Sequence, residues 1–432
     1  MSLTLAHSRP LLSLALIFLS WKTFLLSIAL GATIASDYDT STSLFFRGLY
    51  GSVGVPSLAT RLTRWDALYY VHHTRSGYVY EQEWAFGAGM PLLITSIRAL
   101  LPQSLVGEGA VAEPLLAIAL AHASHMVAIL VLYRLTLMLS GSTKLALVAS
   151  ALHIVSPAGL FLSSPYAESL YACLSFIGYF LFALAIENKR HQVKWALALV
   201  LAGVMFGLAT AVRSNGLSNG LLFVVGAIEC FVSLLRKPSM SRIMALAAPV
   251  LGGICVAAGS FVPQAVAWKR FCLDLAVELQ PRPWCSRTIP SIYAFVQSEY
   301  WNVGFLKYWT LTQLPLFLLA SPMLWILFTS GISTLQDTKC AIRSLKPGTG
   351  QGYRLFLRTL AVIQTVIALL AVSNFHVQII TRLSSGYPVW YWWVAGCLAD
   401  VDQSRLGKAI VAFMVMYAGI QGALFASFLP PA

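Results

Sequence analysis

The chain has 432 residues, of which 58% are hydrophobic and only 10% are charged, and its mean hydropathy is +0.74. A soluble domain carries about 25% charged residues, so this composition excludes a soluble globular protein and predicts a single helical bundle in lipid. The formal net charge is +13, but the basic residues cluster in short segments between apolar runs, which is typical of cytosolic loops facing anionic lipid and argues against nucleic-acid binding.

The apolar runs predict about eleven membrane spans, because about 20 apolar residues are needed to cross about 30 Å of hydrocarbon. The first run, 11–35, is too long for the core of a signal peptide and is expected to persist as an anchor. The run 86–101 is short and is interpreted as interfacial or re-entrant; if it crosses, the count is twelve. The other spans are expected at 115–137, 145–162, 167–186, 195–212, 217–235, 243–264, 312–333, 355–373, 387–399 and 408–428.

The short linkers between these spans indicate the orientation of the chain. Lys and Arg gather at 188–194, 236–242, 339–358 and 405–408. With eleven spans these linkers share one side with the N-terminus, and the excess of positive charge assigns that side to the cytosol. The opposite side receives two long loops, at about 36–114 and 265–311. Long loops on one face of a bundle suggest a working surface, so residues 1–432 are predicted to form one membrane-embedded domain.

The first long loop contains a carboxylate among aromatic and histidine side chains. Residues 63–73 are expected to form a short helix on which Asp66, Tyr70 and His73 share a face. Asp66 can then act as a general base toward a hydroxyl. The competing interpretation is an interfacial helix in which Asp66 caps the helix or pairs with Arg64.

Two further polar segments lie at the ends of spans. Glu168 is expected in the first turn of a helix that follows Pro165, either as a cap that favours the helix dipole or as a polar group lining a cavity at the membrane edge. Arg213 begins the turn 213–216 between two spans. It either extends toward the interface or binds a phosphate through its guanidinium.

The second long loop and the last polar segment combine cations with aromatic residues. Arg282 can contact an anionic group, and Trp284 can either stack on a sugar or anchor the interface. His376 is interpreted either as a catalytic group or as a structural hydrogen-bonding residue. Cys272 and Cys285 flank part of the second loop, and both a disulfide and a free pair are open. The sequence shows no CxxC or Cys/His metal spacing.

These segments together resemble the GPI mannosyltransferase II family of PIG-V type. The resemblance is carried in chain order by Trp65-Asp66 followed by 77–87, by 156–170, by 213–216 and by 284–305. It covers about 60–395 and is weaker at both ends of the chain. It implies a GT-C bundle, an all-α polytopic fold with about 11 spans and catalytic loops in the lumen of the endoplasmic reticulum.

The resemblance also implies a reaction. Dolichyl-phosphate-mannose would donate the second, α1,6-linked mannose to a GPI-anchor precursor with inversion, and Asp66 would act as the base. Arg213, Arg282 and Arg382 would meet the leaving phosphate, no metal or other cofactor is expected, and a small membrane accessory subunit is a candidate partner. The residues expected to bind donor or acceptor are Trp65, Tyr70, His73, Glu81, Glu83, Tyr166, Glu168, Arg213, Asn215, Arg282, Trp284, Gln297, Tyr300, Trp301, Asn302, His376 and Arg382.

Three other functions compete with this interpretation. A sugar-lipid transporter would need charged residues along its spans or an internal repeat, and the spans here are largely free of Asp and Glu. Another lipid-linked-sugar glycosyltransferase could use the same donor with a different acceptor, and only the resemblance of the loops disfavours it. A non-catalytic scaffold subunit would not need two long, polar, aromatic loops.

Overall fold

The computed structural model describes residues 9–32, 37–51, 53–106, 111–274, 282–346 and 350–429, and every regular element within these ranges is helical. Nine of the described helices are long and apolar enough to cross a membrane, which confirms an all-α, multi-spanning membrane protein. They are α2 (Pro10–Gly31), α8 (Ala112–Ser140), α10 (Glu168–Glu187), α11 (Gln192–Val212), η4 with α12 (Ser214–Asn219 and Gly220–Arg236), α13 (Met240–Trp268), η6 with α15 (Leu311–Gln313 and Leu314–Gln336), α16 (Gly350–Ser373) and α19 (Ser404–Ala426).

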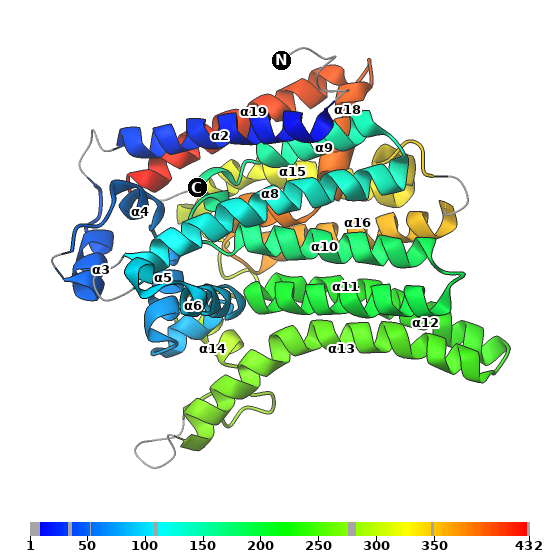
Figure 1. The fold of residues 1–432 in the computed structure, drawn as a ribbon, viewed down its shortest axis with the longest axis horizontal. Coiled ribbons are helices and arrows are strands. Elements are labelled where there is room, and N and C mark those ends of the chain that lie inside the picture. Colours follow the sequence, from blue (N-terminus) through cyan, green and yellow to red (C-terminus); the bar gives the residue numbers. More distant parts are fainter. Residues whose placement is uncertain are drawn as a thin grey trace.

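The long helices lie side by side, and the short helices of the two long loops gather at one end of the bundle (Figure 1). We call this end the loop face. The linkers between α10 and α11 and between α12 and α13 lie at the other end, the basic face. Both predicted long loops therefore lie on one face. The short helices there are α3 (Ser41–Tyr50), α4 (Ser57–Leu62), α5 (Asp66–Ser76), η2 (Glu81–Ala85), α6 (Gly89–Leu100), α7 (Gln103–Val106) and α14 (Ile292–Glu299).

The predicted count of eleven spans is not confirmed, because two of the expected spans are only short helices. The span at 145–162 is α9 (Thr143–Ile154) and the span at 387–399 is α18 (Val389–Ala399). Helices of 12 and 11 residues extend about 18 Å and 17 Å, short of the about 30 Å hydrocarbon core. Residues 33–35, the end of the first expected span, lie outside the described residues.

Irregular but buried segments continue from these short helices toward the loop face. Residues 155–167 hold only the 3₁₀ turn η3 (Gly159–Leu162), and residues 374–388 hold the short turns η8 (Val377–Ile379), α17 (Ile380–Leu383) and η9 (Ser384–Gly386). Pro157 and Pro165 stop helix formation in the first segment, since proline lacks an N–H donor. Both segments are largely buried in the protein, and residues of both line a cavity.

The second long loop is tied to the end of α13 by a covalent link. Beyond Trp268 the chain continues into the π-helical turn η5 (Lys269–Asp274), and Cys272 forms a disulfide with Cys285, with the two Cα atoms 5.7 Å apart. Of the two alternatives for this pair, the structure has the disulfide. The predicted interfacial segment 86–101 is α6, a helix of 12 residues beside α5 on the loop face (Figure 1).

Candidate active site

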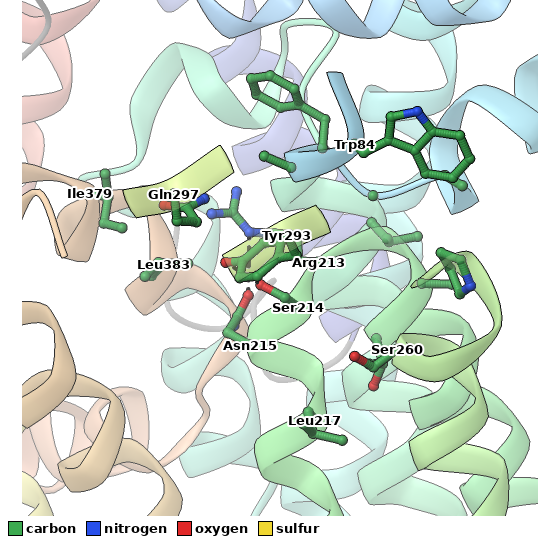
Figure 2. A pocket seen from close by; sticks show the side chains of 18 of the residues that line it. Trp84, Arg213, Ser214, Asn215, Leu217, Ser260, Tyr293, Gln297, Ile379 and Leu383 are labelled. Carbon is green, nitrogen blue, oxygen red and sulfur yellow. Dashed lines mark hydrogen bonds between the residues drawn. The ribbon is translucent and has the colours of Figure 1, made fainter. Parts of the chain in front are cut away.

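A cavity of about 750 Å³ opens among the loop-face segments, and we call it the large cavity. Figure 2 shows Arg213, Ser214 and Asn215 close together in its wall, with Ile379 and Leu383 to one side. Nine of the residues expected to act on a substrate line it, although they come from segments far apart in the sequence. These are Asp66, Tyr70, Tyr166, Arg213, Asn215, Gln297, Trp301, His376 and Arg382.

Asp66 enters the cavity wall through a sharp turn between α4 and α5. Trp65 has a φ of +53°, in the left-handed region that a bulky side chain rarely adopts, and such outliers often mark functional sites. The turn places Asp66 at the first residue of α5. The Tyr166 hydroxyl accepts a hydrogen bond from the Asp66 backbone N–H at 3.1 Å and donates one to the Arg64 carbonyl at 3.2 Å. Tyr166 therefore fixes the backbone on both sides of the turn.

Four charged side chains form an alternating chain beside the cavity. Arg382 Nη1 donates to Asp66 Oδ2 at 2.8 Å, and Arg382 Nε lies 3.6 Å from Glu168 Oε1, which also pairs with Arg213. Glu168 is 1% exposed, whereas the Asp66 side chain is 35% exposed. Burial opposes the charge of Arg382, but Asp66 and Glu168 outweigh it and raise the pKa of Arg382. Asp66 is therefore the carboxylate that is open to a substrate, and Glu168 is the buried counter-ion that holds both arginines.

The Arg213 turn is built by local sequence. Helix α11 ends at Val212, and Arg213 takes an extended conformation. A Cβ on Gly216 would lie 2.7 Å from the Thr210 backbone nitrogen, so glycine allows the turn to fold back onto the last turn of α11. Asn215 donates to the Tyr387 hydroxyl at 2.8 Å and accepts from Arg213 Nε at 3.4 Å. These contacts aim the guanidinium of Arg213 at the cavity.

His376 lies in the cavity wall with its ring held from two sides. Its Nε2 is 3.1 Å from the Trp301 carbonyl oxygen, and its ring packs on Tyr308 with centroids 4.7 Å apart. Burial lowers the pKa of His376. A neutral imidazole that bonds the backbone of the second loop fits a structural role at least as well as a catalytic one.

Several residues expected to bind substrate instead join the two long loops. Glu81 Oε1 accepts from Trp284 Nε1 at 2.9 Å, and Glu81 Oε2 accepts from the Tyr300 hydroxyl at 3.2 Å. Arg282 lies 3.7 Å from the same carboxylate. Glu83, by contrast, makes contacts within the first loop, where it accepts from the backbone N–H groups of Val79 and Tyr80. None of these side chains lines the large cavity.

His73, Trp65 and Asn302 also differ from a simple cavity-lining role. His73 is buried and stacks on Tyr78 with ring centroids 4.2 Å apart. Burial, with His72 nearby, lowers the pKa of His73 to about 3. Asn302 has a φ of +50° and turns the chain after Trp301. Trp65 packs against Phe428 and lines a second, smaller cavity.

This small cavity, of about 270 Å³, meets the large one at Asp66 and Arg382. Most residues of its wall were not predicted from the sequence. Gln421 carries a sequence signal that could have indicated it, because it is an amide within a largely apolar span. Its lining residues are Trp65, Asp66, Pro157, Phe161, Tyr166, His376, Gln378, Ile379, Thr381, Arg382, Tyr417 and Gln421.

The described residues contain no group of three or more His, Cys, Asp and Glu side chains placed to hold a metal ion. The carboxylates at the large cavity, Asp66 and Glu168, are paired with arginines. The expectation that the reaction uses no metal stays a prediction.

Known proteins share this chain's sequence over nearly its full length. A family model described as "Mannosyltransferase (PIG-V)" matches residues 12–432. Proteins named GPI mannosyltransferase 2 are 54% identical in Gibberella zeae, over 98% of both chains, and 45% identical in Chaetomium globosum, over 99% of this chain and 97% of the relative. The relative in Schizosaccharomyces pombe is 30% identical over 95% of this chain and 84% of its own.

Among solved structures, the oligosaccharyltransferase of Archaeoglobus fulgidus superposes on 96% of this chain with a TM-score of 0.43 and 13% identity. The chain spans about half of that structure, 53% of its length. This chain belongs to the PIG-V mannosyltransferase family.

Proposed function

We propose that this chain is a mannosyltransferase of the endoplasmic reticulum that transfers mannose from dolichyl-phosphate-mannose to a GPI-anchor precursor and forms the second, α1,6-linked mannose. Its family and its relatives named GPI mannosyltransferase 2 support the reaction. The observation that carries the chemistry is the Asp66 carboxylate, which Arg382 holds in the wall of the large cavity.

Asp66 acts as the general base. Its Oδ2 accepts the bond from Arg382, so Oδ1 can take the proton of an acceptor hydroxyl within the partly exposed wall. A β-linked donor that gives an α-linked product reacts with inversion, and one positioned base is sufficient for a single displacement. Tyr166 keeps the carboxylate in place through the backbone of Asp66.

Arg213 and Arg382 stabilise the leaving phosphate. Both line the large cavity, and Glu168 holds both. Preorganised cations next to a developing negative charge lower the barrier for its departure. Arg282, the third arginine expected from the sequence, is half exposed and pairs with Glu81 away from the cavity. It is therefore left out of the proposed site.

The large cavity also suits the start of a polyprenyl chain. Besides Arg213, the wall of the large cavity contains apolar side chains from η4, from α16 and from the segment 377–383. These are Leu217, Ile367, Leu370, Ile379 and Leu383. A phosphate at Arg213 would place the attached lipid along this apolar wall, which is the arrangement that a membrane-embedded donor requires.

We assign the loop face to the lumen. The basic linkers gather at the other end of the bundle, as expected for cytosolic loops. The Cys272–Cys285 disulfide lies on the loop face, and disulfides persist in oxidising compartments such as the lumen of the endoplasmic reticulum.

The test is mannosyl transfer in microsomes that carry Asp66→Asn in place of the wild-type protein. We expect the variant to accumulate normally but to transfer at a rate at least about 100-fold lower, because general bases contribute roughly 10²–10⁴-fold. Asp39→Asn is the matched control, since Asp39 lies in the same loop and accepts from the backbone of its own turn at Ser41. Full activity of Asp66→Asn would remove Asp66 as the base.

Lipid analysis of cells that lack the protein tests the acceptor. Accumulation of a GPI precursor with one mannose is the expected result. Normal GPI precursors with altered N-glycans would instead indicate a glycosyltransferase with another acceptor.

A further inference from the structure

The small cavity and the large cavity share part of their walls. Asp66, Tyr166, His376, Ile379 and Arg382 belong to both walls. A group in the small cavity would therefore reach the same carboxylate as a donor in the large cavity. Arg213 and four of the apolar side chains, those of Leu217, Ile367, Leu370 and Leu383, line the large cavity but not the small one.

Gln421 is the strongest sign that the small cavity binds a polar ligand. It comes from α19, it is 2% exposed, and neither atom of its side-chain amide has a hydrogen-bond partner among the described residues. A buried amide without partners costs free energy, so such a group in a cavity wall points to a ligand that satisfies it. Gln378 adds a second amide to this wall.

The backbone opposite Gln421 is shaped to approach it closely. Gly159 has a φ of +51°, and a Cβ at this position would lie 3.2 Å from Gln421 Oε1 and 3.2 Å from the Ala418 carbonyl oxygen. The irregular segment 155–167 thus packs directly on α19 at the level of the amide. A side chain at position 159 would crowd the Gln421 amide, and glycine avoids this.

Aromatic side chains supply the remaining wall. Trp65, Phe161 and Tyr166 line the small cavity, and the Arg382 guanidinium lies over the rings of Phe161 and Tyr166 at 5.2 Å and 5.5 Å. Aromatic faces beside amide groups match a sugar, which presents apolar C–H faces and hydroxyls. The cavity is about a third of the size of the large one, which suits one ring better than a lipid phosphate with its chain.

We infer that the small cavity binds the terminal sugar of the acceptor, with Gln421 as a specificity-determining residue that hydrogen-bonds its hydroxyls. This inference rests on the proposed function. Asp66 takes the proton from the acceptor hydroxyl as that oxygen bonds to the anomeric carbon of the donor. The bond from this carbon to the phosphate oxygen breaks on the opposite side, and its electron pair leaves with the phosphate beside Arg213. Donor and acceptor then lie in different cavities that meet at the base.

Gln421→Leu tests this assignment through the separate Michaelis constants of the two substrates. Initial rates are measured in detergent-solubilised membranes with dolichyl-phosphate-mannose and with a one-mannose GPI precursor, each varied in turn. We expect the KM for the acceptor to rise about tenfold, as when a substrate loses hydrogen bonds to a site built for them, while the KM for the donor stays unchanged. Leucine in place of a buried unpartnered amide is not expected to impair folding.

Two comparison variants make the result decisive. Gln403→Leu makes the same chemical change at an exposed residue just before α19 and should leave both constants unchanged. Arg213→Lys should raise the KM for the donor and leave the KM for the acceptor unchanged. Gln421→Leu with wild-type constants, or with a raised KM for the donor alone, would overturn the inference while the proposed function stands. A wild-type protein that transfers no mannose to the precursor would overturn both.

Discussion

At the scale of single residues, the loop face contains a histidine that burial keeps uncharged. His73 is 3% exposed and has a pKa of about 3, because its ring is buried and His72 lies nearby. Glu83 is the carboxylate facing it, 3.7 Å from Nε2. In the unfolded chain a histidine has a pKa of about 6.5. Between these two values the unfolded state binds one proton more than the folded state, so stability falls as the pH falls below about 6.5.

His73→Gln should therefore weaken the sensitivity of the fold to acid. The wild-type protein is expected to lose up to about 1.4 kcal/mol per pH unit through His73 between about pH 6 and pH 4, and the variant lacks this contribution. The measurement is the thermal unfolding midpoint in detergent at pH 7 and at pH 5. His191→Gln, at an exposed residue of the α10–α11 linker, should behave as the wild type. Equal midpoint shifts in all three proteins would show that His73 does not titrate on unfolding.

Individual site residues were only partly predictable from the sequence. Asp66 was identified because a carboxylate among aromatic residues in a polar loop is conspicuous. That Arg382 holds it was not predictable, since the two residues are 316 positions apart and only the packing of the bundle brings them together. Glu81 and Trp284 were equally conspicuous, but they bond to each other. A polar residue in a loop thus looks the same in the sequence whether it faces a substrate or another loop.

At the scale of elements, α11 and α13 pack at very short distance through glycines. A Cβ on Gly207 would lie 2.3 Å from the Cys255 carbonyl oxygen, and one on Gly203 would lie 2.4 Å from the Gly252 Cα. Small residues at such contacts let membrane helices approach closely. Arg213 follows directly on the end of α11, and Gly259 of α13 lines the large cavity. The glycine contact therefore fixes the distance across one part of the site.

Gly207→Ala should force these helices apart. Overpacking of this kind costs about 1–3 kcal/mol, so we expect a lower thermal midpoint together with reduced transfer activity, as the Arg213 turn moves away from the cavity. Gly253→Ala is the matched control, because a Cβ there would make an ordinary contact of 3.6 Å with Phe223. If Gly207→Ala kept wild-type stability and activity, the close contact would not be needed for the site.

The hydropathy of the sequence predicted the helices that are long and regular. The two failures have different causes. At 145–162 the apolar composition continues beyond Ile154, where α9 ends, whereas the run 387–399 is filled by α18 and is itself too short to cross. Residues 155–167 are almost entirely buried, and Pro157 and Pro165 prevent a helix there. Hydropathy measures burial in lipid or in protein alike and does not distinguish a helix from an irregular buried segment. These irregular segments carry Tyr166 and Arg382 into the site.

At the scale of the whole molecule, the prediction of one face with long loops and one with basic linkers is confirmed by the arrangement of the helices. The sequence could predict this arrangement because successive spans place their linkers alternately at the two ends of the bundle. The linkers rich in Lys and Arg then fall at the same end. The compartment that each end faces depends on the orientation in which the protein is inserted in its membrane. The proposed chemistry depends on it, because Asp66 and the disulfide both lie at the loop face.

The free and bonded cysteines allow this orientation to be tested in sealed microsomes. Cys340 is free and exposed in the linker between α15 and α16, on the basic face, whereas Cys272 and Cys285 are bonded on the loop face. A membrane-impermeant maleimide should label Cys340 without detergent, since basic linkers face the cytosol, and Cys340→Ser should abolish that labelling. The loop-face pair should react only after detergent and reductant together, because a disulfide has no free thiol. Labelling of Cys340 that requires detergent would place the active site in the cytosol and remove the oxidising compartment that the disulfide needs.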